Sequence, residues 1–339
     1  MMLNIIWFIL FVVIIAGYLI LDGFDLGVGI LHPFVAKNDH ERRISLNSIG
    51  PIWDGNEVWL VLGGGALFAA FPMVYASLFS GFYVAMMLVL LVLILRTVAI
   101  EFRSKEKNPR WRSFWDMVFF ASSLGIALLL GVAFGNVMAG VPLDQNQNMS
   151  VSLLSILSPF ALLMGVTTIF MLAMHGGIYL TMKTDGELQA RVRSWIPRMM
   201  VVFFVLNTLV VLSTVLMHQT IVDRYRAEIW PVIFPTLALG ALIVAAVMLR
   251  RGKDFAAFVA SGAMIALLLM SAAAGLYPNL LLSTIDPAYN LTIFNGASEA
   301  NTLTVMLVIA LIGMPVVLLY TAGVYYFFRG KVKLTPESY

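Results

Sequence analysis

Nine long apolar stretches constrain what this chain can fold into. A helix rises about 1.5 Å per residue, so about 20 apolar residues cross the ~30 Å hydrocarbon core of a bilayer. Of the 339 residues, 61% are apolar and only 12% are charged, and a water-soluble domain of this length could not bury so much apolar surface. The sequence therefore predicts an all-α polytopic membrane protein with about nine transmembrane helices, forming a single integral membrane domain over residues 1–339. The predicted spans are 4–31, 52–71, 76–96, 114–139, 153–182, 198–218, 229–249, 255–281 and 302–328.

The distribution of basic residues predicts the orientation of these spans. Of the 21 lysines and arginines, 19 fall in alternate links and the C-terminal tail, and only Arg224 and Arg226 fall on the other side. Basic links face the cytoplasm, so we expect the N-terminus outside and the C-terminus inside. The basic residues are interpreted as topology signals rather than a nucleic-acid site. The run from Arg96 to Arg112 is interpreted as a solvated cytoplasmic link.

Four acidic residues lie within or beside the first two predicted spans: Asp22, Asp25, Asp54 and Glu57. Each pair has the i, i+3 spacing that places two side chains on one helix face. From Asn4, Asp22 and Asp25 lie about 27 and about 32 Å along the first span, which is near its cytoplasmic end. Asp54 and Glu57 lie in the first turns of the next span. All four carboxylates are therefore expected on the cytoplasmic third of one helical hairpin.

Two interpretations of these acids remain open from the residues alone. Carboxylates inside a membrane cost about 2.5–3.5 kcal/mol each, so they indicate a function by default, here a proton-uptake path. Alternatively, Asp54 and Glu57 are favoured at a helix N-terminus by the macrodipole. Asp22 and Asp25 would then form ion pairs with Arg42 or Arg43.

The chain offers few residues that could hold a metal or a haem. It has no cysteine, and His175 is the one histidine placed plainly inside a predicted span. A membrane haem held by two histidines needs two at matched depth, so we expect His175 to be a hydrogen-bonded residue. Trp59 lies deeper than the interfacial tryptophans and could line a cavity. Six glycines of the first two spans are expected at close helix contacts: Gly23, Gly27, Gly29, Gly63, Gly64 and Gly65.

Several motifs occur in an order that resembles subunit II of cytochrome bd-type quinol oxidases. They are Asp22-Gly-Phe-Asp-Leu-Gly-Val-Gly29, Asn38-Asp-His-Glu-Arg-Arg43, Trp53-Asp-Gly-Asn-Glu-Val-Trp-Leu60, Gly64-Gly-Ala-Leu-Phe-Ala-Ala70, Phe79-Ser-Gly-Phe-Tyr-Val-Ala-Met86, Phe102-Arg-Ser-Lys105, Gly131-Val-Ala-Phe-Gly-Asn136 and Leu319-Tyr-Thr-Ala322. The resemblance extends over nearly the whole chain and is densest in residues 20–140. It is the run of linked motifs, and no single one of them, that makes the resemblance specific.

The resemblance implies a role in a terminal oxidase that oxidises quinol and reduces dioxygen to water in the cell membrane of a bacterium or archaeon. It implies that haem b and haem d are held by a partner, subunit I, and that this chain carries no haem. Some family members also hold a quinone in subunit II, and a small single-span accessory subunit is a further expected partner. It implies a proton path through Asp54, with Asp25 as a weaker candidate, and an oxygen path past Trp59.

Two other classes of function fit a chain of this kind less well. A secondary transporter would bind its coupling ion near the bilayer midplane, between repeats, whereas the acidic cluster is predicted off-centre and no repeat is visible. A structural membrane scaffold would pair the acids with Arg42 and Arg43. The haem-free subunit of a quinol oxidase is therefore the main hypothesis.

Overall fold

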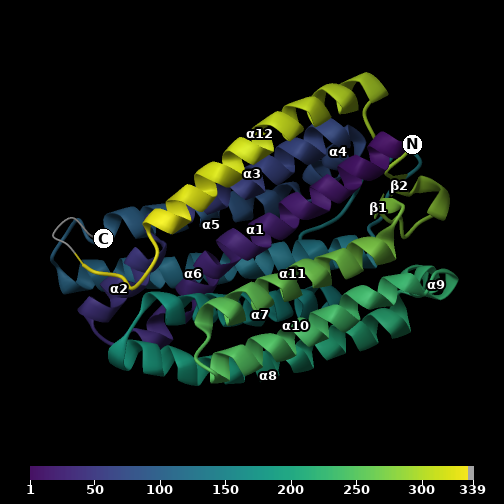
Figure 1. Cartoon of the computed structure of the whole chain (residues 1–339). Coiled ribbons are helices and arrows are strands. Elements are labelled where there is room, and N and C mark those ends of the chain that lie inside the picture. Colours follow the sequence, from purple (N-terminus) through teal and green to yellow (C-terminus); the bar gives the residue numbers. More distant parts are fainter. Residues whose placement is uncertain (335–339) are drawn as a thin grey trace.

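The computed structural model describes residues 1–334, and Figure 1 shows a bundle of long helices with the N-terminus at one end and the last described residues at the other. The two short strands pair antiparallel at the end that carries the N-terminus. The helices are α1 (Met2–Val35), α2 (Asp39–Ile49), α3 (Trp53–Ala70), α4 (Pro72–Gly81), α5 (Tyr83–Phe102), α6 (Pro109–Ala139), α7 (Pro159–Lys183), α8 (Gly186–Met217), α9 (Gln219–Ala227), α10 (Ile233–Arg250), α11 (Asp254–Leu276) and α12 (Ala300–Phe327); the strands are β1 (Asn279–Leu281) and β2 (Leu291–Thr292).

Eight helices within the described residues are long and apolar enough to cross a membrane. They correspond to eight of the nine predicted spans. The ninth predicted span, 52–71, is also a helix, α3, but its first turns carry Asp54, Asn56 and Glu57 and it is not among the eight. The all-α membrane architecture predicted from the apolar stretches is thus confirmed.

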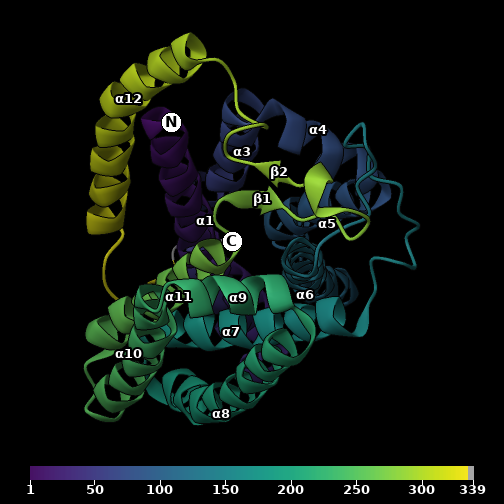
Figure 2. The ribbon, with the colours of Figure 1, turned by 90° about the vertical axis from the view of Figure 1, so that its right-hand side faces the viewer.

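Helix α1 is the centre of the bundle. Every residue from 22 to 32 is buried, and α3, α6, α7 and α11 all pack against this helix (Figure 2). The crossing with α7 depends on glycine, because a Cβ on Gly27 would lie 2.0 Å from the backbone oxygen of Leu172. A Cβ on Gly176 of α7 would likewise lie 2.5 Å from the backbone carbonyl carbon of Gly27. The predicted close contacts therefore hold for Gly23, Gly27, Gly29 and Gly63. A Cβ added to Gly64 or Gly65 of α3 would meet nothing within 4 Å.

The third predicted span is displaced along the chain. The continuous apolar run predicts one helix over 76–96, but the helix breaks at Phe82, and α5 runs from Tyr83 to Phe102. This shift moves Arg96 from a link into the helix. The interpretation of Arg96 as part of a solvated link is wrong, since its side chain is 0% exposed.

We use the term basic end for the end of the bundle that carries α2, the α5–α6, α7–α8 and α10–α11 links, and the described tail (Figure 1). A buried network of ion pairs links the helices at the basic end. Asp116 of α6 accepts hydrogen bonds from His32 of α1 at 2.9 Å, from Arg42 of α2 at 2.8 Å and from Arg103 at 2.7 Å. Arg103 also donates to Asp39 at 2.8 Å. Asp116, and neither of the acids of α1, is therefore the partner of Arg42.

Helix α2 is held to α8 by a second ion pair. Arg191 donates to Glu41 at 2.8 and 3.2 Å, and it also donates to the backbone oxygen of Val35 at the end of α1. Glu41 accepts a further hydrogen bond from the backbone nitrogen of Lys37 at 2.7 Å. The hydrogen bonds from Arg191 hold the pKa of Glu41 below its ordinary value. A lowered carboxyl pKa stabilises the fold above the ordinary carboxyl range, and this stability disappears as the pH falls through the lowered pKa.

We expect Glu41→Gln to lower the free energy of unfolding of the purified complex by about 1.5–3 kcal/mol near pH 7, because a hydrogen-bonded charge pair is lost. The difference from the unmodified protein should shrink at an acidic pH below the lowered pKa of Glu41, where Glu41 itself is protonated. Thermal or denaturant unfolding of the variant and of the unmodified complex at both pH values measures this difference in the free energy of unfolding. Glu106→Gln, at an exposed position, is the matched control. A difference that stays constant with pH would contradict the assignment.

Candidate functional site

A fully buried ion pair joins α1 to α5. The carboxylate of Asp22 and the guanidinium of Arg96 are 2.7 Å apart, and both side chains are 0% exposed. Arg96 also approaches Glu57 of α3 at 3.6 Å. A buried charge is tolerated only when an opposite charge compensates it. Arg96 therefore provides the positive charge around which the acids of α1 and α3 gather.

Asp25 lies one turn from Asp22 and is held differently. It is 0% exposed, and its Oδ2 accepts a hydrogen bond of 2.8 Å from Nδ2 of Asn56 on α3. The Oδ1 of Asn56 in turn accepts a hydrogen bond of 2.8 Å from the hydroxyl of Tyr325 on α12. The side-chain amide of Asn56 thus links α1, α3 and α12. The other oxygen of Asp25 has no hydrogen-bond partner among the described residues.

Asp54 and Glu57 lie in the first turns of α3, as the sequence predicted. The side chain of Glu57 is 21% exposed, whereas Asp54 is exposed and has no side-chain partner in the part of the chain that the structure describes. The four acids therefore form a series that runs from the surface at Asp54, through Glu57, to the buried Asp22 and Asp25. The interpretation of Asp22 and Asp25 as ion-pair partners of Arg42 is wrong, because Arg96 and Asn56 take that place.

The charges of this cluster do not balance. Asp22, Asp25 and Glu57 face one guanidinium, that of Arg96, in a region where charge is poorly solvated. Three ionised carboxylates around one cation would leave excess negative charge in the interior, which is costly. Such a group can exchange protons among its members.

Trp59 lies on the next turns of α3, buried against α1. Its ring is close to Gly17 of α1, because a Cβ added to Gly17 would lie 2.6 Å from a ring carbon of Trp59. The tryptophan is 7% exposed and packs with Ile14 and Tyr18. It is thus part of the packed core rather than an exposed aromatic residue, and it is not among the wall residues of the two cavities described below.

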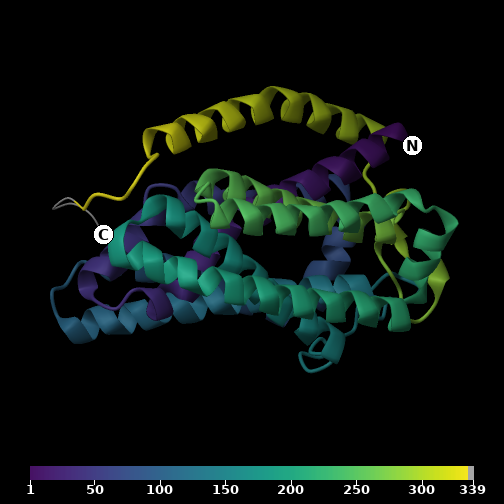
Figure 3. The same ribbon diagram turned by 60° about the horizontal axis from the view of Figure 1, so that its bottom comes forward.

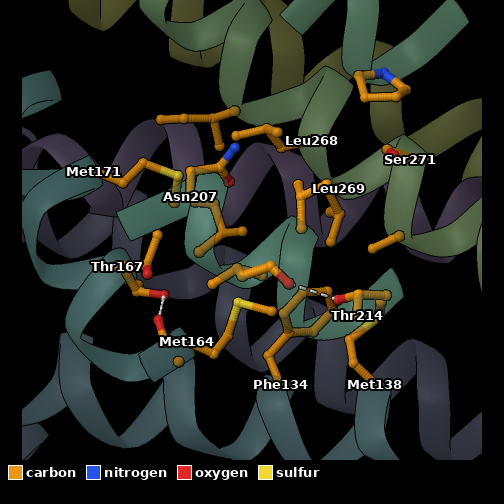
Figure 4. A pocket seen from close by; sticks show the side chains of 18 of the residues that line it. Phe134, Met138, Met164, Thr167, Met171, Asn207, Thr214, Leu268, Leu269 and Ser271 are labelled. Atoms are coloured by element: carbon orange, nitrogen blue, oxygen red, sulfur yellow. Dashed lines mark hydrogen bonds between the residues drawn. The ribbon is translucent and has the colours of Figure 1, made fainter. Parts of the chain in front are cut away.

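A cavity of about 480 Å³ lies between α1, α6, α7, α8 and α11 (Figure 4). Its walls are mostly apolar, with Phe134, Met164 and Leu268 among the side chains drawn. Asn207 and Thr214 of α8 are among its polar wall residues. A second apolar cavity of about 230 Å³ shares Phe134 and Leu269 with it. The two cavities are therefore adjacent, and the larger one opens to the surface of the bundle at Val211 and Val215, which are 49% and 50% exposed.

His175 is buried and both of its ring nitrogens are engaged. Nδ1 lies 2.7 Å from the hydroxyl of Ser261, and Nε2 lies 3.0 Å from the backbone oxygen of Ile20. The ring also stacks on Phe258 with the centroids 4.9 Å apart. The prediction of a hydrogen-bonded histidine is confirmed. Within residues 1–334 there is no group of three or more metal-ligating His, Asp or Glu side chains.

Sequence reasoning missed Arg96, Asn56 and Tyr325. Arg96 could have been found, because it is a lone arginine in an otherwise apolar stretch. Asn56 lies between Asp54 and Glu57 in a motif that drew attention only to its acids. Tyr325 carries no local signal, since its partner is 269 residues away.

Known proteins resemble this chain over almost its full length. The family model of cytochrome bd terminal oxidase subunit II matches residues 3–328. Cytochrome bd-I ubiquinol oxidase subunit 2 of Escherichia coli (strain K12) is 37% identical over 360 residues, covering 97% of this chain and 95% of that protein. Cytochrome bd ubiquinol oxidase subunit 2 of Bacillus subtilis (strain 168) is 38% identical over 335 residues, covering 97% of each.

The fold is also that of a solved structure. A chain of the bd oxidase from Geobacillus thermodenitrificans superimposes with a TM-score of 0.80 over 97% of this chain and 99% of that one, at 17% sequence identity. Together with the eight apolar helices, the family match makes this a multi-pass protein of the cell membrane. The chain belongs to the family of cytochrome bd terminal oxidase subunit II.

Proposed function

We propose that this chain is the haem-free subunit of a quinol oxidase and supplies part of its proton-uptake path. The observation that carries the proposal is the series of acids from exposed Asp54 to buried Asp25, organised around Arg96. Reduction of dioxygen to water consumes protons. Taking those protons from the cytoplasm makes the reaction electrogenic without a pump.

The residues have distinct roles in this proposal. Asp54, at the exposed end, takes up a proton from water, and Glu57 passes it inward to the buried group. Asp22 and Asp25 hold the proton next to the guanidinium of Arg96, which compensates the negative charge left when a proton departs. From there the proton leaves this chain for its partner.

The partner subunit is proposed to pack on the outer face of α3. Val61 and Phe68 of this helix are 72% and 60% exposed. On the same helix, a Cβ added to Gly55, Gly64 or Gly65 would meet no atom within 4 Å. These glycines leave room for another helix to approach closely. We propose that the haems b and d lie in that partner.

The orientation follows from the basic end. Without Arg96, 18 of the 21 basic residues still lie in its links, in its helix ends and in the tail. We propose that this end faces the cytoplasm, with the N-terminus outside. The exposed Asp54 then lies towards the cytoplasmic side, where protons are taken up.

We expect Asp54→Asn to reduce quinol oxidase turnover of the assembled complex by about 10-fold, equivalent to about 1.4 kcal/mol in the barrier, because the first proton acceptor is lost. Haem content should stay unchanged, and Asp54→Glu should restore most of the turnover. Oxygen consumption per haem measures the effect.

Asp223→Asn is the matched control, since Asp223 is also exposed but lies on α9 at the opposite end. Turnover of Asp54→Asn equal to that of this control would remove Asp54 from the proton path.

The residues of this chain do not fit a haem. His175 would have to give up its bonds to Ser261 and to Ile20 before either nitrogen could bind iron. We therefore expect His175→Asn, which keeps a polar side chain, to leave the ratio of haem to protein in the purified complex unchanged. The optical spectrum measures that ratio. Loss of one haem from the variant would show that this chain supplies a ligand.

We further propose that the larger cavity holds the apolar chain of a quinone, and that oxygen reaches the partner past the apolar side chains around Trp59. The support is the cavity's size of about 480 Å³ and its apolar walls. Asn207 and Thr214 would provide polar contacts for a quinone ring.

Filling the cavity with Ala272→Phe should lower the amount of quinone that copurifies with the complex, because Ala272 lines the cavity wall. Val244→Phe, on an exposed part of α10, is the control. Organic extraction followed by mass spectrometry measures quinone and lipid per complex. Equal quinone content in the two variants would place the quinone elsewhere.

A further inference from the structure

Helix α12 is the most loosely packed of the long helices. Of its residues, only Leu303 is buried, and its packing within this chain is chiefly on α1 and α3. Figures 2 and 3 show it at the edge of the bundle, separated from α10 along most of its length. Near its end, Tyr320, Tyr326 and Phe327 are 71%, 65% and 79% exposed. Tyr325 differs from these neighbours, because it is half-buried and points into the bundle.

Tyr325 reaches the acidic cluster through one residue. Its ring meets Phe24 of α1 edge-on, with the centroids 6.4 Å apart and the planes at 89°. Its hydroxyl donates to Oδ1 of Asn56 at 2.8 Å, and Nδ2 of Asn56 donates to Asp25 at 2.8 Å. Asn56 is 2% exposed, so no bulk water competes for either end of the amide.

The direction of these bonds fixes the orientation of the amide. One end of an asparagine amide is a donor and the other is an acceptor. A hydroxyl that donates to the oxygen of Asn56 keeps the NH₂ group turned towards Asp25. Without that hydroxyl, the buried oxygen of this amide would lose its donor, and the orientation of Asn56 would be less stable. Tyr325 therefore stabilises the orientation of Asn56 in which Nδ2 donates to Asp25.

The end of α12 is also held in place by hydrogen bonds to α7. Just beyond Tyr325, the backbone oxygen of Phe328 accepts a hydrogen bond from Lys183 of α7. Lys331 donates to the backbone oxygen of Thr181 at 2.8 Å, and the backbone nitrogen of Val332 donates to the backbone oxygen of Lys183 at 2.9 Å. These bonds fix the last turn of a helix that is otherwise loosely packed.

We propose that Tyr325 is a positioning residue for proton transfer, because its hydroxyl holds Asn56 in the orientation that donates to Asp25. This inference rests on the proposed function of the acidic cluster. The charged and titratable groups around Asp25 are Asp22 of α1, Arg96 of α5, Glu57 of α3, Tyr179 of α7 and Tyr325 itself.

The test is the pH dependence of turnover in the assembled oxidase carrying Tyr325→Phe, which removes only the hydroxyl. We expect turnover near pH 7 to fall by about 2- to 10-fold, the range expected for loss of one orienting hydrogen bond. The pH profile of turnover should shift along the pH axis, because the amide that donates to the Asp25 carboxylate is no longer held in place. Tyr320→Phe, at an exposed position of the same helix, should behave as the unmodified oxidase.

A second variant covers the case in which Tyr325→Phe assembles poorly. Asn56→Ala removes the donor to Asp25 directly and should shift the pH profile in the same direction. Adding Tyr325→Phe to Asn56→Ala should then shift it no further. An additional shift in the double variant, or a lower amount of complex with an unaltered pH profile per haem, would overturn the positioning role.

Asp25→Asn separates this inference from the function on which it rests. If Asp25→Asn turns over like the unmodified oxidase, the proposed function of Asp25 fails. If Asp25→Asn is slow while Tyr325→Phe keeps the original pH profile, the proposed function stands and the role of Tyr325 fails.

Discussion

The buried ion pair between Asp22 and Arg96 is the interaction on which the candidate site depends. Both side chains are fully buried, and an uncompensated charge at either position would be strongly destabilising. The pair therefore fixes the rotation and depth of α5 relative to α1. Glu57 on α3 approaches the same guanidinium, so the three helices are positioned by one charge. Asp25, one turn further along α1, receives its own neutral donor from α3.

The surroundings of this pair are rigid on two sides. Gly27 and Gly176 let the backbones of α1 and α7 come into contact, which leaves no space for either helix to slide. At the basic end, Asp116 gathers His32, Arg42 and Arg103 from three other segments. A bond network of this kind orders the helix ends next to the acids. By contrast, α12 is loosely packed, and its Tyr325 is linked to Asp25 through Asn56 of α3.

The arrangement supports the proposal that this subunit carries protons for chemistry performed in its partner. The acids become progressively more buried from Asp54 to Asp25, whereas His175 is engaged by two hydrogen bonds and offers no free nitrogen to a metal. The relatives are named as one subunit of an oxidase, which agrees with the proposed division of roles between this chain and a partner. What distinguishes the site chemically is the unequal charge around Arg96, which leaves room for a proton among three carboxylates.

The sequence by itself determined the membrane class, the approximate helices and the presence of four acids near one end of the first two spans. Hydropathy and spacing are local properties, and they report helices and shared faces well. They could not place the break at Phe82, and for that reason they put Arg96 in a link. Only the tertiary structure decided that Arg96 pairs with Asp22, that Arg42 pairs with Asp116, and that Tyr325 reaches Asn56. Such pairings depend on how distant helices rotate and cross, and no local pattern in the chain records that geometry.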